Sequence, residues 1–520
     1  MKPLQLLLAT ATLCLATYSC SGPQVPDQYA DSGRLPDIYP DYRDVTIPVN
    51  IAPLAFSMDT TQVDEMVARF ACGEQTLVCG GENISPDIDD WHRLLANVQG
   101  KDLNVDLYTR SGSQWTHHQP FAIHVSQDSI DPWLSYRLIS PSYVTYEELT
   151  LNQRCLENFD ERVMVDNMLC GDEENGQCVN CHNYQRQTPG RMQFHARQKD
   201  GGTVIVYDGT VRKINMSNDS ILSAGVYPTW HPWLPLIVYS TNKTSQTFHT
   251  RNLNKIEVFD AASDLIAYDV ARNEATNIER DSTEFECYPY WAPDGRTLYY
   301  CSAHFEFRDT IEHGTEVIKR AQEVKYNLYR KTFSPETMEF GPRQLVYAAD
   351  TITSIRLGAN ADSTDTSGLS ATLPRVSPDG RFLVFTLGKY GVFHIWHHEA
   401  DLYIMDLRSG DVRPFTELNS DDTESYHTWS STGRWMVFSS RRDDSGFTRP
   451  FIGHIDAQGH ASKPFELPQA DPEYHRQLMK SYNIPEFMLG PVEQTPQQFA
   501  DVLKGSAGEK VKYVQRLTKK

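Results

Sequence analysis

Cys178, Cys181 and His182 form a Cys-x-x-Cys-His motif, the one short pattern in this chain whose residue types and spacing prescribe a particular chemistry. Two thiols three positions apart can each add to a vinyl group of one porphyrin, and the adjacent imidazole can then bind the iron from the proximal side. The motif therefore predicts a covalently attached c-type haem. The same cysteines could instead form a disulfide or supply half of a zinc site.

The use of such a haem would depend on its second axial ligand, for which Met192 and His195 are the nearby candidates. Because they lie three residues apart on one expected strand, their side chains point to opposite faces, and only one can approach the iron. Met192, which we favour, would raise the reduction potential and suit electron transfer, whereas an open position would suit gas binding or peroxide chemistry. The structural alternatives are Met192 as core filler and His195 as a surface residue.

The N-terminus predicts export. Lys2 precedes a mostly apolar run at 6–16 that is too short to span a bilayer, and small residues follow up to Cys20. Residues 17–20 resemble a bacterial lipobox, with Thr17 where leucine is usual. We expect lipidation at Cys20, the alternative being ordinary signal cleavage nearby. The protein would then sit in the bacterial cell envelope, on the periplasmic side or the cell surface, where c-type haem is attached.

Six further cysteines fall into local pairs that suit an oxidising compartment, namely Cys72 with Cys79, Cys155 with Cys170, and Cys287 with Cys301. For the last pair, alignment of repeats places the two residues opposite each other on neighbouring strands, and two buried free thiols are the alternative. A zinc site at the central motif could instead recruit Cys155 and Cys170.

Charge and missing motifs narrow the function. The net charge of −20 makes a nucleic-acid partner unexpected. The chain contains no Gly-x-Ser-x-Gly elbow, phosphate loop or His-Glu-x-x-His motif, so we assign no catalytic residue and favour a protein that is not an enzyme.

The elements around the motif predict a mainly β protein. Four stretches align without gaps, beginning at Tyr227, Tyr288, Leu373 and Tyr426, and each reads as strand, tight turn and strand. A second hairpin follows each of them, and a fifth copy begins near Pro189. Four strands per repeat predict a β-propeller of about five four-stranded blades. Insertions at 241–263, 303–325 and 387–398 would share the face opposite the turns, where we expect a protein partner.

The remaining segments complete the expected organisation. A β-sandwich-like domain would contain a helix beginning near Asp87 with Trp91 in its core, and a connector would carry the haem motif. The predicted boundaries are a lipoprotein signal peptide at 1–20, a tether at 21–42, the sandwich at 43–128, the connector at 129–185, the propeller at 186–490 and a solvated tail at 491–520.

A histidine-rich segment of the third insertion offers a second candidate site, with His394, His397, His398 and Glu399. These side chains would not all share one side of a strand, so a metal site would need partners from other insertions, such as His249, His304 or His313. The alternative is a solvated or packed histidine-rich rim.

The elements Trp291-Ala292-Pro293-Asp294-Gly295 and Val376-Ser377-Pro378-Asp379-Gly380 resemble the TolB-type, WD40-like family of propeller repeats. The whole chain also resembles a group of bacterial envelope lipoproteins in which such a propeller follows a Cys-x-x-Cys-His segment. That resemblance implies haem binding at the motif and implies no substrate. Two hypotheses follow. The protein is a haem-carrying lipoprotein for electron transfer or redox sensing, or a non-catalytic scaffold that binds a protein or glycan and keeps the two cysteines as a structural disulfide.

Overall fold

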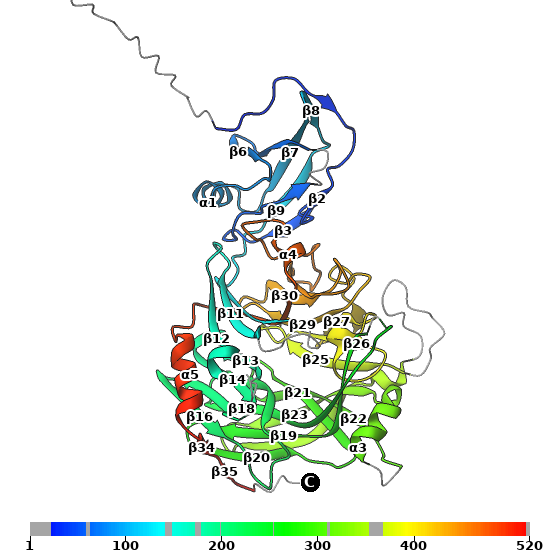
Figure 1. Cartoon of the computed structure of the whole chain (residues 1–520). Helices are drawn as coiled ribbons and strands as arrows, with labels where there is room; N and C mark the ends of the chain where they lie inside the picture. The colour runs from blue at the N-terminus through cyan, green and yellow to red at the C-terminus, as the bar shows by residue number, and fades with distance from the viewer. Residues whose placement is uncertain are drawn as a thin grey trace, which may run out of the picture.

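The computed structural model describes residues 22–58, 63–140, 148–171, 178–197, 199–252, 254–308, 312–352 and 368–515. The predicted signal peptide and Cys20 lie outside these ranges. The chain is mainly β and forms a β-propeller with a smaller N-terminal domain above it (Figure 1). Within the described ranges, no helix is long and apolar enough to cross a membrane.

The N-terminal domain is one sheet and a helix, where the sequence predicted a sandwich. Its strands follow the order β1-β8-β7-β5-β6, with β9 beside β7 and β3 beside β9. The bounds are β1 (Ala30–Asp31), β3 (Val45–Ile47), β5 (Glu65–Cys72), β6 (Gln75–Gly81), β7 (Asp102–Ser111), β8 (Gln114–His117) and β9 (Phe121–Val125), beside a short pair of β2 (Ile38–Tyr39) and β4 (Ser57–Met58). Helix α1 (Ile88–Asn97) begins at the N-cap Asp87, as predicted, and buries Trp91, Leu94 and Leu95. The helix supplies the packing surface that a second large sheet would have supplied.

Five sheets surround the propeller axis. The first repeat contains β13 (Cys178–Gln185), β14 (Thr188–Arg197), β15 (Gly202–Tyr207) and β16 (Thr210–Asn215). A nine-stranded sheet holds two repeats, joined where β19 contacts β21: β17 (Gly225–Trp230), β18 (Leu236–Phe248), β19 (Ile256–Asp269) and β20 (Glu274–Glu279), then β21 (Glu284–Trp291), β22 (Thr297–His304), β23 (Tyr326–Ser334) and β24 (Glu339–Tyr347).

Two further repeats follow as separate sheets, with β25 (Ser370–Val376), β26 (Phe382–Gly388), β27 (Asp401–Asp406) and β28 (Val412–Pro414), then β29 (Glu424–Trp429), β30 (Trp435–Ser440), β31 (Arg449–His454) and β32 (Phe465–Glu466). The turns after the first strands contain Gly295, Gly380 and Gly433 at φ of 57°, 73° and 69°. These left-handed conformations confirm the tight turns predicted from the repeat.

One more four-stranded unit comes from both ends of the propeller chain. Strands β10 (Trp133–Ile139), β11 (Thr150–Cys155) and β12 (Glu161–Asp166) lie in the predicted connector, and β33 (Ser481–Met488) pairs with β10. The innermost strands β13, β17, β21, β25, β29 and β33 contact one another in a closed ring. The sheets therefore give six four-stranded units, and the predicted five blades are not confirmed. Repeat alignment missed this unit because its innermost strand is contributed from the far end of the chain.

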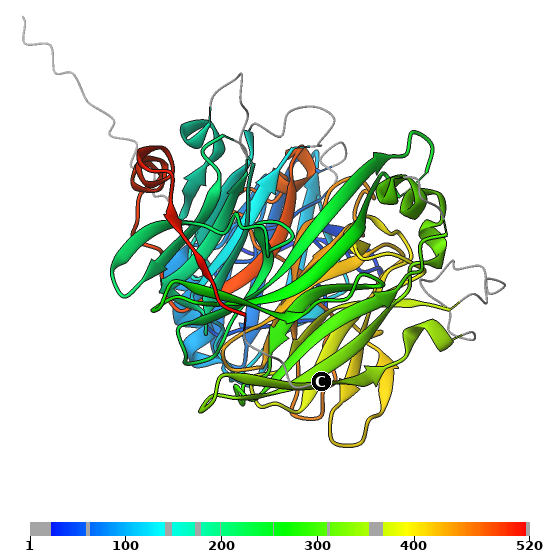
Figure 2. The same cartoon turned by 90° about the horizontal axis from the view of Figure 1, so that it is seen from below.

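Short helices and two small strands cover the outside. They are α2 (Asn167–Cys170), α3 (His313–Lys319), α4 (Tyr474–Gln477) and α5 (Pro496–Gly505), with 3-10 turns at Ala321–Glu323, Ala349–Thr351 and His394–Trp396. In the predicted solvated tail, β34 (Glu509–Lys510) pairs with β16 and β35 (Lys512–Tyr513) pairs with β20. Figure 2 shows this red segment running from α5 along the propeller. Residues 509–513 thus add a short edge strand to each of two sheets, which the charged residues of this segment did not predict.

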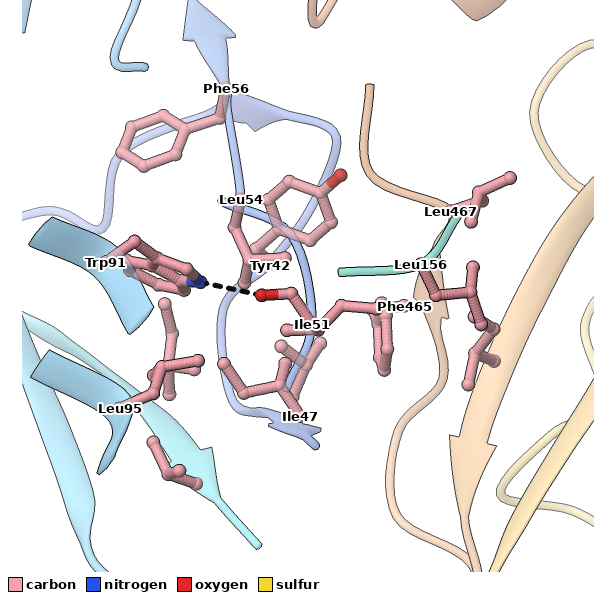
Figure 3. Packing of buried hydrophobic residues seen from close by; sticks show 14 of the residues in the cluster. Tyr42, Ile47, Ile51, Leu54, Phe56, Trp91, Leu95, Leu156, Phe465 and Leu467 are labelled. Carbon is pink, nitrogen blue, oxygen red and sulfur yellow. Dashed lines mark hydrogen bonds between the residues drawn. The ribbon is translucent and has the colours of Figure 1, made fainter. Parts of the chain in front are cut away.

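The two domains share an apolar core. Trp91 donates its indole N–H to the carbonyl of Ile51 at 3.2 Å. The same cluster contains Leu156, Phe465 and Leu467 from the propeller side (Figure 3). Burial of apolar surface at this contact fixes the N-terminal domain on the propeller.

Candidate functional site

The predicted haem motif lies inside the first strand of the first repeat, where the sequence placed it just before that strand. Every innermost strand contains a bulge at which two residues face one residue of the next strand. The first bulge residue has positive φ in all of them: Cys181 (56°), Tyr227 (48°), Tyr288 (48°), Leu373 (54°), Tyr426 (50°) and Ile484 (52°). Cys181 is therefore the first repeat's version of a feature common to the whole ring.

These six residues, which we call the axial plug, close the centre of the propeller. Tyr227, Tyr288, Leu373, Tyr426 and Ile484 belong to one apolar cluster. The rings of Tyr227 and Tyr288 lie 4.4 Å apart between centroids. The Cys181 thiol adjoins the backbone N–H of Tyr227, and burial raises the pKa of this thiol. The plug is a packing element, and Cys181 is part of it.

The motif residues do not fit a covalently bound haem as they are arranged. Cys178 is half-buried and packs against the cluster of Val179, Tyr184 and Met192, whereas Cys181, 3% exposed, faces the plug. His182 is 1% exposed against the backbone of Ile484, and burial together with nearby Arg137 lowers its pKa to about 3. A porphyrin needs both thiols at one edge of one ring. Here Cys178 packs beside Val179 and Tyr184, whereas Cys181 adjoins the backbone of Tyr227.

The two candidate distal ligands also have packing roles. Met192 is fully buried in the cluster that surrounds Val179 and Tyr184. His195 is 4% exposed, its Nδ1 lies 3.2 Å from Thr203 Oγ1, and burial lowers its pKa to about 3. The buried Met192 matches the alternative that it fills the core. His195 does not match the alternative that it lies on the surface, because its side chain is buried.

All eight described cysteines are free thiols in the structure. Cys79 pairs with Ala68, four residues before Cys72 on β5, which separates the two cysteines by about 13 Å along the strand. Disulfides need Cα atoms within about 7 Å, so this register does not fit the predicted pair. Cys155 and Cys170 lie at opposite ends of the β11–β12 hairpin and do not fit either. Only Cys287 and Cys301 face each other in register, as predicted.

The histidine-rich insertion forms a buried charged network. His397 Nε2 lies 2.9 Å from Glu257 and its Nδ1 lies 3.6 Å from Glu399. Burial lowers the pKa of His397, but the two carboxylates outweigh it and raise that pKa to about 9. His249 also reaches Glu257, at 3.5 Å. Among the described residues no group of three or more His, Cys, Asp or Glu side chains is placed to hold a metal ion, and this network ties two insertions together.

His394, His304 and His313 take other partners. His394 Nδ1 lies 3.0 Å from Thr372 Oγ1, His304 Nδ1 lies 3.1 Å from Glu284, and the ring of His313 stacks on Phe307 at 3.8 Å. His398 pairs with Asp422 at 3.1 Å. The histidines that the sequence grouped by spacing therefore do not converge on one point.

A cavity, which we call the axial cavity, opens on the face of the propeller that carries the tight turns, opposite the insertions. It has a volume of about 550 Å³. Each innermost strand contributes the residue that lies two positions after its plug residue: Asn183, Thr229, Tyr290, Arg375, Thr428 and Glu486. We call these residues the cavity ring. Cys178, Cys181 and His182 are not among the described residues that line the cavity.

Two charged side chains belong to the ring, and the strands that carry them, β25 and β33, are separated by β29. The Arg375 guanidinium lies over the Tyr290 ring, 4.9 Å from its centroid, and donates from Nη1 to the Pro374 carbonyl at 2.9 Å. Glu486 accepts from Asn183 Nδ2 at 3.0 and 3.2 Å. Burial raises the pKa of Glu486 to about 7, although the Asn183 hydrogen bond and Arg375 act to lower it.

Aromatic side chains form the wall and mouth of the cavity. Trp230, Trp291 and Trp429 line it, and Trp233 at the mouth is 51% exposed. Trp429 Nε1 donates to the Arg375 carbonyl at 3.2 Å, which fixes this indole beside the ring. Sequence reasoning placed a partner on the opposite face. The sequence feature that could have indicated this cavity is the varied, mostly polar residue two positions after each plug residue.

Comparisons with known proteins leave the family open. No family model matches the chain, and no curated protein matches it. Among solved structures, prolyl oligopeptidase B from Galerina marginata bound to a 25mer macrocyclization substrate is 8% identical over 69% of this chain, with a TM-score of 0.35. This chain spans 42% of that protein's length.

Two other solved structures show similarly low sequence identity to this chain. An oligogalacturonate lyase in complex with manganese is 12% identical over 69% of this chain and 87% of its own, with a TM-score of 0.28. A DUF4784 family protein from Bacteroides caccae is 10% identical over 74% of this chain and 97% of its own, with a TM-score of 0.21. None of these likenesses tells what this chain binds.

Proposed function

We propose that this protein is an envelope-anchored, TolB-type propeller lipoprotein that binds a small polar ligand in the axial cavity, tethered to the membrane through Cys20. The observation that carries the proposal is the contrast within the repeat. The bulge geometry is the same in all six innermost strands, yet the cavity ring carries an arginine, a glutamate, an asparagine and a tyrosine besides two threonines. Packing alone gives no reason for opposite charges at equivalent, half-buried positions, whereas ligand binding does.

The same residues favour binding over catalysis. Glycoside hydrolysis usually needs two carboxyl groups on either side of the bond that breaks. Glu486 is the one carboxylate among the described residues that line the cavity. The Trp429 indole, held by its hydrogen bond to Arg375, and the paired Asn183 amide match a site that holds a ligand in place.

The motif has a structural role in this proposal. Cys181 completes the axial plug and His182 fills the second bulge position, while Asn183 supplies the motif strand's contact to the cavity. Haem attachment stays a prediction of the sequence, and absorbance of the pyridine haemochrome tests it directly.

The test compares two equally exposed aromatic residues on opposite faces. The full chain, purified in detergent, is screened by calorimetry against soluble saccharides and peptides. Trp233, at the cavity mouth, and Phe248, on the insertion hairpin, are both 51% exposed. We expect Trp233→Ala to weaken the bound ligand at least fivefold and Phe248→Ala to leave it unchanged. The opposite pattern would place the ligand on the insertion face and refute the proposal.

A further inference from the structure

We propose that the ligand of the axial cavity is an acidic saccharide, held with its carboxylate against Arg375 and its sugar rings on the aromatic wall. This inference rests on the proposed function and adds the chemical class of the ligand. Three observations support it: the positive charge of the cavity lining, the backbone carbonyl groups that already accept hydrogen bonds, and the exposed aromatic surface.

The cavity has the opposite charge balance to the whole protein. The chain carries a net charge of −20, but three arginines line the cavity against Glu486 alone. Arg191 is already paired with Asp208 at 2.9 Å. Arg186 and Arg375 form no ion pair with a carboxylate within the described part of the chain. A positive cavity in an acidic protein attracts an anion, and the planar guanidinium of Arg375, which lies over the Tyr290 ring, has further N–H groups that can donate to a carboxylate.

The backbone around the cavity argues against an extended peptide. A peptide that adds to a strand edge needs free carbonyl groups along that edge. Here side chains of the protein already use them: Gln185 donates to His231 and Leu234, Thr428 donates to Pro485, and Gln187 donates to Trp429. The recognition surface therefore consists of side chains, which suits a ligand whose own groups are hydroxyls and carboxylates.

The aromatic wall and Glu486 match the rest of a saccharide. The C–H face of a sugar ring is apolar and packs on an aromatic face, and the half-exposed Trp233 offers such a face at the mouth. Among the described side chains Asn183 alone donates to Glu486, at 3.0 Å and 3.2 Å, and the backbone of Tyr184 also donates. Further lone pairs of the carboxylate can therefore accept from sugar hydroxyls.

The experiment measures binding of short oligosaccharides of uronic acid to the full chain by calorimetry. Matched probes are the same saccharides as methyl esters, sulfated saccharides of equal length and acidic peptides of equal charge. We expect the uronate to bind at least tenfold more tightly than each of the other probes. Arg375→Ala should remove this preference for the free acid, and Arg375→Lys should restore part of it.

A matched control is Arg408→Ala, which removes an exposed arginine outside the cavity and should change nothing. Melting temperatures of all variants show whether they are folded. Equal binding of acid and ester, or preference for the sulfated saccharide or the peptide, overturns the inference while the cavity can still be the binding site. Failure of every probe, including neutral saccharides, overturns the proposed function as well.

Discussion

The axial plug and the cavity ring are two layers of one propeller, separated by two residues on every innermost strand, and they differ in what their side chains do. The plug holds three tyrosines, a leucine and an isoleucine in one apolar cluster around the axis, with Cys181 beside Tyr227. The ring two residues further on holds charged and polar groups around a cavity of about 550 Å³. One backbone repeat thus provides a packing layer and, two residues further along each strand, the layer that we propose binds the ligand.

The largest expected effect comes from breaking the plug. Tyr288 is 2% exposed and its ring contacts that of Tyr227. Removing a buried aromatic ring costs about 3–5 kcal/mol, and we expect Tyr288→Ala to lose that much free energy of unfolding in urea. The matched variant Tyr290→Ala, from the cavity ring, should lose less stability and should weaken ligand binding. If Tyr290→Ala is the more destabilising of the two, the division into a packing layer and a recognition layer is incorrect.

A smaller effect is expected at the cysteines. Cys181 is 3% exposed within the plug, whereas Cys178 is half-buried at the start of β13. Cys181→Ala should therefore lower the free energy of unfolding by about 1–2 kcal/mol, and Cys178→Ala by less. Protein made in cells able to attach c-type haem should show no pyridine haemochrome band. A band that disappears in the double variant would contradict the structural role and restore the haem hypothesis.

The propeller and its turns could be predicted from the sequence alone, because the Pro-Asp-Gly elements repeat and strand-like runs follow them. It did not give the unit that contains β33, since pairing between distant ends leaves no local signal. The cavity ring was missed for a different reason. Arg375 and Glu486 are single polar residues within strands, and only the three-dimensional ring shows that they line the same cavity.

The haem predicted from Cys178, Cys181 and His182 stays a prediction, because spacing alone does not include how the segment is packed. The residue types of this motif prescribe haem chemistry when the segment is free to wrap around a porphyrin. Here the segment is a strand whose bulge turns Cys181 toward the axis, as Tyr227 and Tyr288 are turned in later repeats. The alignment of Cys181-His182 with Tyr227-Pro228 could have been seen in the sequence if the repeat had been extended by one strand.

The smallest expected effect is a pH dependence of the cavity ring that the plug should lack. Burial raises the pKa of Glu486 from 4.5 to about 7, so the side chain loses its proton between pH 6 and 8. The groups that face it are Arg375, the Asn183 amide and the Tyr184 backbone N–H, and none of them titrates in this range. The affinity for an anionic ligand should therefore fall a few-fold as pH rises through about 7, because the cavity gains a negative charge.

Stability should also fall as pH rises, but over the range from pH 4.5 to about 7. The pKa of Glu486 is higher in the folded protein than in the unfolded chain, so its protonation favours folding below pH 4.5 and this contribution is lost as pH rises to about 7. Glu486→Gln keeps the shape and removes this titration, so it should flatten the pH profile of the affinity. It should only reduce the pH dependence of stability, because burial also raises the pKa of Asp260 and of Asp264 to about 6. If the affinity of Glu486→Gln still falls between pH 6 and 8, a group other than Glu486 titrates. The assignment of the pH dependence to the cavity ring is then incorrect.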